Sequence, residues 1–181
     1  MNDTIWTIIA AALLIILMVG NRKVRLISLL SKQIQVFKNA RTNKISVWDI
    51  LCFIVFPICL ALILVYGLGI CIDDTLSGIL TTVFSLVFTV LFGFAAIIVG
   101  KLDSKNEFEK KVVEETFVSI MSATVLSLIS VICSIIVVKI DAGWAVNLVS
   151  ALVYSVSIMT IMLLLLVSKR TFIIYNDTTK K

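Results

Sequence analysis

The sequence predicts an all-α protein, a polytopic transmembrane helical bundle of four to five spans. Sixty per cent of its 181 residues are apolar and the mean hydropathy is +1.14, whereas soluble domains are about 45–50 % apolar. The run from Gly78 to Gly100 contains twenty-three residues without a charge, and at about 1.5 Å per residue a helix of that length crosses the hydrocarbon of a bilayer. Residues 1–181 therefore form a single membrane domain, because no segment between the apolar runs is long enough for a soluble core.

Five apolar runs are candidate spans, at about residues 5–20, 47–72, 78–100, 112–138 and 145–167. The first run is short and crosses only with local bilayer thinning or snorkelling of its flanks. Its positive charges follow the apolar residues, whereas a cleavable signal peptide carries them in front, so we expect an uncleaved span. Pro57 should bend the second span, as a matter of shape or as a gate. The short link after it predicts that the second and third spans are antiparallel neighbours in the middle of the bundle.

The distribution of basic residues predicts the orientation of the chain. With these spans, fifteen of the sixteen lysine and arginine residues fall on one side of the membrane, and only Lys139 falls on the other. Short loops rich in Lys and Arg stay in the cytoplasm. We therefore expect the N-terminus outside and the C-terminus in the cytoplasm.

The segment 22–46 is predicted to be a cytoplasmic amphipathic element. Ile27, Leu30 and Ile34 recur at helical spacing on one side, with Lys32 and other polar residues opposite. Such a helix lies on the membrane surface, continues the first span as a stalk, or binds a partner. Its basic residues are candidates for contact with lipid or a partner: Arg22, Lys23, Arg25, Lys32, Lys38, Arg41 and Lys44.

Small and hydroxyl-bearing residues form two stripes that are candidate helix-packing surfaces. One stripe lies on the third span at four-residue steps, and the other lies on the fourth span and could face the first. In lipid, small residues let two helix backbones approach closely. The alternative for the third span is that its hydroxyls bond only to their own backbone. The residues are Thr81, Ser85, Thr89 and Gly93 in the third span, and Ser119, Ser127, Ser130 and Ser134 in the fourth.

The fifth span carries a polar side of its own. Asn147, Ser150, Tyr154 and Ser157 fall on one side of the helix. An unpaired amide in hydrocarbon costs several kcal/mol, so we expect Asn147 to have a partner inside the bundle.

The residue types predict a protein that is not an enzyme and has no cofactor. The chain has no histidine, no glycine-rich phosphate loop and no nucleophile elbow. Its four cysteines, Cys52, Cys59, Cys71 and Cys133, lack metal-ligand spacing and are interpreted as small apolar packing residues, so no metal site is expected. The basic residues flank apolar runs, which favours contact with an anionic leaflet over direct contact with nucleic acid.

The motifs "GILTTVFSLVFTVLFGFAAIIVG" and "NEFEKKVVEETF" resemble small multi-span proteins of bacterial antiphage defence, in particular the membrane subunits of the Kiwa system. The resemblance covers the middle of the chain. It implies a homo-oligomeric protein of the bacterial inner membrane that senses phage attack at the envelope and works with a cytoplasmic DNA-binding partner. It assigns no role to any individual residue.

The sequence is compatible with three functional hypotheses. The leading hypothesis is a non-enzymatic defence subunit that oligomerises and uses its basic inner face to hold a cytoplasmic protein. The alternative is a pore-forming or holin-like permeability protein, in which the hydroxyl-bearing faces surround water. A subunit of a small-solute transporter is a third hypothesis, which lacks support because no charged or broken-helix binding group stands at mid-span.

Overall fold

A computed structural model describes residues 26–36, 47–100, 107–140 and 143–179 of the chain. Within these residues every regular element is a helix, and four helices are long and apolar enough to cross a membrane. The predicted all-α transmembrane bundle is thereby confirmed. The predicted span 5–20 lies outside the described residues, as do Arg22, Lys23, Arg25, Lys38, Arg41 and Lys44.

The first described span is a helix of changing width. It consists of α3 (Val47–Ile50), the π-helical segment η1 (Leu51–Val55), α4 (Phe56–Leu62) and a second π-helical segment η2 (Ile63–Gly67). Pro57 stands in the first turn of α4, directly after η1. A proline has no N–H and its ring clashes with the preceding turn, and a π-type turn is one way for a helix to accommodate that break.

The other three spans are continuous α-helices: α5 (Asp74–Val99), α6 (Glu107–Val137) and α7 (Gly143–Thr179). Asp73 caps α5, because its carboxylate accepts a hydrogen bond of 2.8 Å from the amide of Leu76. The second predicted span ends at Gly67, short of residue 72, and Gly69 follows with a φ of 68°. That left-handed conformation favours glycine and interrupts the helix.

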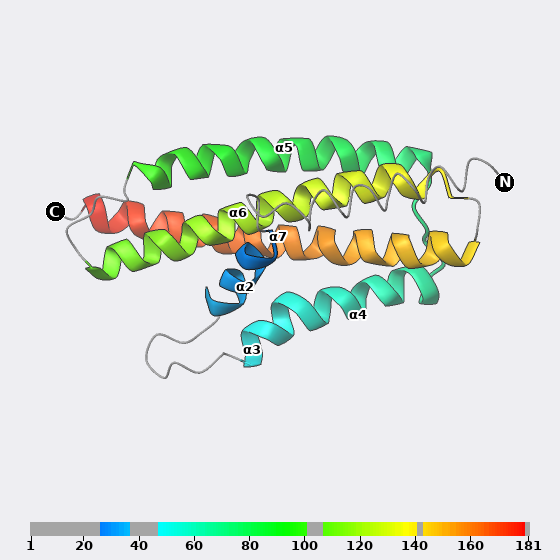
Figure 1. The fold of residues 1–181 in the computed structure, drawn as a ribbon, viewed down its shortest axis with the longest axis horizontal. Coiled ribbons are helices and arrows are strands. Elements are labelled where there is room, and N and C mark those ends of the chain that lie inside the picture. Colours follow the sequence, from blue (N-terminus) through cyan, green and yellow to red (C-terminus); the bar gives the residue numbers. More distant parts are fainter. Residues whose placement is uncertain (1–25, 37–46, 101–106, 141–142, 180–181) are drawn as a thin grey trace.

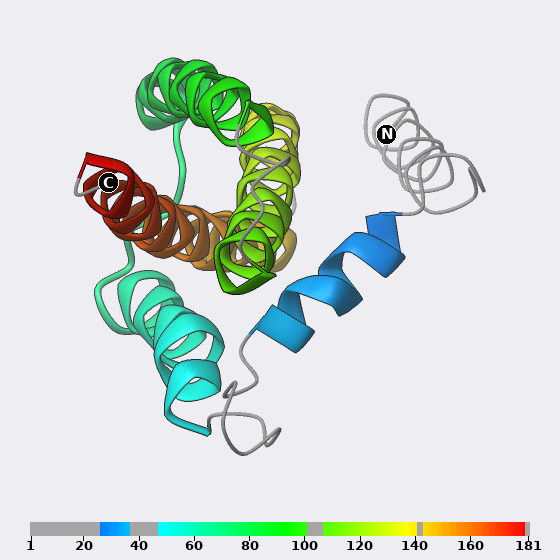
Figure 2. The same ribbon diagram turned by 90° about the vertical axis from the view of Figure 1, so that its left-hand side faces the viewer.

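The four spans form a curved row in the order α5, α6, α7, α4 (Figure 2). α6 packs against both α5 and α7, and α4 packs against the far side of α7. The prediction that the second and third spans are packed neighbours is therefore wrong. The link between them has no helix and crosses one end of the row (Figure 1). Its short length limits the distance between the two helix ends, but it does not make the two helices pack against each other.

Successive spans run in opposite directions (Figure 1). One end of the row contains the end of α5, the start of α6 and Arg170, and we call it the Arg170 end; α3 begins on the same side but nearer the middle of the long axis (Figure 1). The opposite end contains the 68–73 link and the start of α7, and we call it the Asn147 end. α2 (Leu26–Val36) lies against α6 and runs across the long helices (Figures 1 and 2).

The core lies between α5, α6 and α7. Its larger cluster joins Leu91, Ile98, Val113, Ile120 and Val167, together with Ala123 and Leu163. A smaller cluster at the Asn147 end joins Ile72, Val137 and Val153. On α5 the buried positions follow a seven-residue step, at Ser77, Phe84, Leu91 and Ile98, so α5 contributes one narrow face to the bundle.

Candidate functional site

The small-residue stripe of α5 faces away from the bundle. Ser85, Thr89 and Gly93 are exposed, Thr81 is half-buried, and no atom lies within 4 Å of a Cβ built on Gly93. The interpretation that this stripe faces the serine stripe of α6 is therefore wrong. The reason is that large apolar side chains of α5, Leu91 and Ile98 among them, pack in the core cluster with residues of α6. As a surface for packing against another molecule, the stripe stays a prediction.

The hydroxyls on this outer face are bonded to their own helix. Thr81, Ser85 and Thr89 each donate to the carbonyl four residues earlier, at 2.9, 2.8 and 3.0 Å. These are the bonds expected from the alternative in which the hydroxyls of the third span bond only to their own backbone. Because each proton is already used, the face needs no water to satisfy its donors.

The serine stripe of α6, by contrast, is inside the bundle. Ser119, Ser127, Ser130 and Ser134 are all at most 1 % exposed. Oγ of Ser130 lies 2.8 Å from Oγ of Ser157 on α7, and Ser77 of α5 donates a 2.8 Å hydrogen bond to the carbonyl of Ser134. α6 is thus the helix that both neighbours share, and the packing role of these four residues stays a prediction.

Asn147 has a partner, as expected from its amide. Cys71 donates its thiol to Oδ1 of Asn147 at 3.0 Å, and the backbone amide of Ile72 donates to Oγ of Ser150 at 3.1 Å. Both donors belong to the link between the first two described spans. The polar side of α7 thus fixes the link across the Asn147 end, which explains why α4 and α5 end up on opposite sides of α7.

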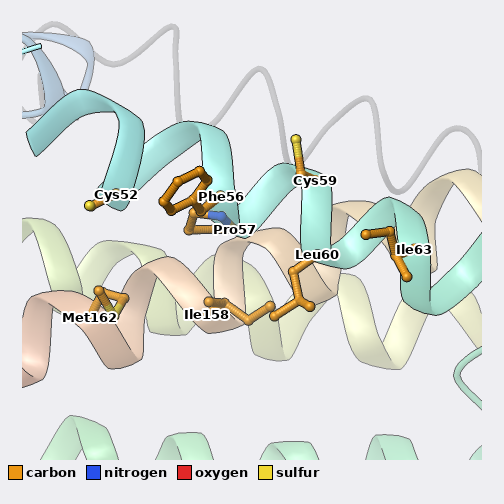
Figure 3. A pocket seen from close by; sticks show the side chains of 8 residues that line it. All are labelled: Cys52, Phe56, Pro57, Cys59, Leu60, Ile63, Ile158 and Met162. Atoms are coloured by element: carbon orange, nitrogen blue, oxygen red, sulfur yellow. The ribbon is translucent and has the colours of Figure 1, made fainter. Parts of the chain in front are cut away.

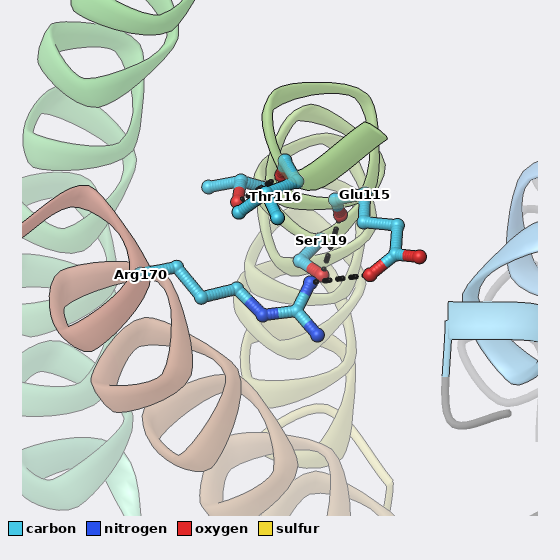
Figure 4. Close-up of polar contacts among 5 residues, drawn as sticks. Glu115, Thr116, Ser119 and Arg170 are labelled. Carbon is cyan, nitrogen blue, oxygen red and sulfur yellow. Dashed lines mark hydrogen bonds and ion pairs between the residues drawn. The ribbon is translucent and has the colours of Figure 1, made fainter. Parts of the chain in front are cut away.

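A charged cluster lies at the opposite end of the bundle. Nη1 of Arg170 on α7 is 3.6 Å from Oε2 of Glu115 on α6, with 20 % and 30 % of the two side chains exposed (Figure 4). The carboxylate of Asp49 on α3 also interacts electrostatically with Arg170. At 3.6 Å the contact is an ion pair that is long for a hydrogen bond. It joins α6 and α7 where both side chains are largely buried, and there the Coulomb energy is greater than at an open surface.

This cluster was not predicted from the sequence. Asp49, Glu115 and Arg170 are more than fifty positions apart from one another in the sequence. One signal was present: Glu115 stands near the entry of one span and Arg170 near the exit of the next. Residues at those positions in antiparallel neighbours lie at the same depth, so opposite charges there are natural partners.

An apolar groove of about 380 Å³ opens between α4 and α7 (Figure 3). Cys52 and Cys59 both line it and both have free thiols. Seven residues on one helix separate their Cα atoms by about 10 Å, too far for a disulfide. The groove offers space for hydrocarbon and no polar group that could orient a substrate. Its lining comprises Cys52, Phe56, Pro57, Cys59, Leu60, Ile63, Ile158 and Met162.

Among the basic candidates for lipid or partner contact, Lys32 is the one whose side chain is described, and it is exposed on α2. Within the described ranges no group of three side chains is arranged to hold a metal ion.

Taken with the four apolar spans, the curved row and its two polar ends define a multi-pass α-helical membrane protein. Comparison of the chain with protein-family models, with curated proteins and with solved structures finds no match.

Proposed function

We propose that this chain is a non-enzymatic subunit of the bacterial inner membrane that oligomerises, holds a cytoplasmic protein and takes part in antiphage defence by sensing attack on the envelope. The observation that carries the proposal is the projection of two helices at the Arg170 end. α6 carries the exposed residues Lys110, Lys111 and Glu114 in its first turns, and α7 continues past Lys169 and Arg170 to Thr179. The nine residues after Arg170 extend α7 by about 13 Å.

The Arg170 end has the properties of a platform for a soluble partner. The ion pair between Glu115 and Arg170 fixes α6 and α7 at the base of their projections. The same end receives fifteen of the sixteen lysine and arginine residues if the predicted topology holds, which assigns it to the cytoplasm. The resemblance to membrane subunits of the Kiwa system implies a role in phage defence together with a cytoplasmic DNA-binding protein. We propose that the platform holds this protein.

Site-specific crosslinking tests the platform. We expect a photo-crosslinking residue at Lys111 or Glu114, both exposed near the start of α6, to capture one soluble protein in the native host. The same residue at Trp144 or Leu148, exposed at the Asn147 end, should not capture it. Deleting the gene of the captured protein should then lower resistance to phage as much as deleting this chain.

Two results would contradict the proposal. Lys111 and Glu114 could give only lipid adducts or none, or the captured protein could be dispensable for phage resistance. A protein captured equally at both ends would indicate non-specific contact and would also count against the platform.

Self-association is expected to use the outer face of α5. Gly93→Leu should weaken association in liposomes by on the order of tenfold, because a large side chain keeps two backbones apart. The variant should leave the single chain intact, since the space around Gly93 is open within 4 Å. Single-molecule photobleaching measures the oligomer. Gly143→Leu, at another exposed and open glycine, is the matched control.

An unchanged oligomer in Gly93→Leu would remove α5 as the association surface. The same liposomes distinguish the permeability alternative, in which the exposed hydroxyls of α5 surround water. Ion leakage through wild-type protein that Gly93→Leu abolishes would favour that alternative over the subunit proposed here.

A further inference from the structure

α2, the helix that packs on α6, carries a buried polar residue. Gln33 is 6 % exposed, yet neither Nε2 nor Oε1 of its amide has a hydrogen-bond partner among the described residues. The next residue, Ile34, is 45 % exposed. At these two positions α2 buries an amide and exposes an apolar side chain, the opposite of what is usual for an amphipathic helix packed on a neighbour.

This arrangement makes the α2–α6 contact weaker than apolar packing would. A buried amide that loses water and gains no partner raises the free energy of the packed state. If α2 leaves α6, the amide regains water or lipid headgroups, and the exposed side chain of Ile34 is available to insert into the membrane surface. The two positions of α2 are thus brought close in free energy, which is the condition for a ligand or partner to shift a population.

We propose that α2 is a releasable strap on α6, a helix that alternates between packing on α6 and lying free on the membrane surface. Its direction suits the second position, because α2 already runs across the spans at the level of α3 (Figures 1 and 2). The free position uncovers the side of α6 on which α2 lies, and α6 also forms part of the platform. The regulatory purpose of the strap rests on the proposed function, whereas its movement does not.

Distance measurements by electron spin resonance test the movement on the full chain in lipid nanodiscs. Spin-labelled noncanonical residues replace Ser31 on α2 and Lys169 on α7, both of which are exposed. The wild-type chain should give two distances, and Gln33→Leu should reduce the longer population by roughly tenfold or more, because it removes the unpaired amide. Gln33→Glu should make the longer population dominant, because a buried carboxylate costs more than an amide.

Two controls accompany these variants. Lys32→Gln, on the exposed side of the same helix, should leave both populations unchanged. A second label pair at Val90 on α5 and Leu128 on α6, both exposed, should give one distance in every variant, which shows that the bundle is intact.

The strap is overturned if all three residues at position 33 give the same single distance, or if Gln33→Glu stays packed. Failure of the strap and failure of the proposed function are separable. Crosslinking of a soluble partner with an immobile α2 removes only the strap, and a mobile α2 without any partner at Lys111 or Glu114 removes only the platform.

Discussion

Leu91→Ala is expected to lower the free energy of unfolding by about 2–5 kcal/mol, the range for truncating a well-packed core leucine. Leu91 is fully buried and belongs to the larger core cluster between α5, α6 and α7. Truncation removes its contacts with the neighbouring helices and leaves a cavity that rigid spans fill only in part. Steric-trapping measurements of reversible unfolding in bicelles, at protein dilutions that keep the chain monomeric, give the required free energies.

The matched control lies on the same helix. Leu86 is 64 % exposed, so in the monomer its side chain contacts lipid in both the folded and the unfolded state. Leu86→Ala should therefore change the free energy of unfolding by less than about 0.5 kcal/mol. Leu86→Ala could instead lower the free energy of unfolding as much as Leu91→Ala, or more. In that case the side of α5 that carries Leu91 is not the side that packs in the bundle.

The sequence of α5 does not indicate which side of the helix faces the bundle, for a physical reason. Its buried residues Phe84, Leu91 and Ile98 and its exposed residues Leu86 and Phe92 are equally apolar. Lipid solvates such residues as well as a protein interior does, so the pattern of hydrophobicity does not indicate which side faces the bundle. The situation differs on α6, because this helix packs against a neighbour on each of two sides. There the small residues Ser130 and Ser134 are fully buried.

Other features followed directly from the residues. Uncharged runs of hydrocarbon length predicted the described spans, because a charge in the bilayer centre is costly. Asn147 was expected to need a partner, but nothing in the sequence indicated that the partner would be Cys71, seventy-six residues away. Loop length suggested the wrong neighbour for α4, because it limits the distance between helix ends and not the choice of packing face.

The second large effect is expected at the charged cluster. Glu115→Leu should destabilise the chain by about 1–2 kcal/mol, between the values for exposed and fully buried ion pairs, since the two side chains remain 30 % and 20 % exposed. Arg170→Leu should cost more, because it takes the shared cation away from two carboxylates, those of Glu115 and Asp49. Unfolding in bicelles again provides the measurement.

The double variant separates the ion pair from the other contacts of its members. Glu115→Leu and Arg170→Leu together remove both members of the ion pair, so only Asp49 loses a partner charge. Leucine suits the apolar surroundings, and the combined cost should be about 1 kcal/mol or more below the sum of the single costs. Simple additivity would mean that the pair contributes nothing and that α6 and α7 are joined by packing alone. In that case the platform would lose its fixed base, and the shared depth of Glu115 and Arg170 would reflect only where two apolar spans end.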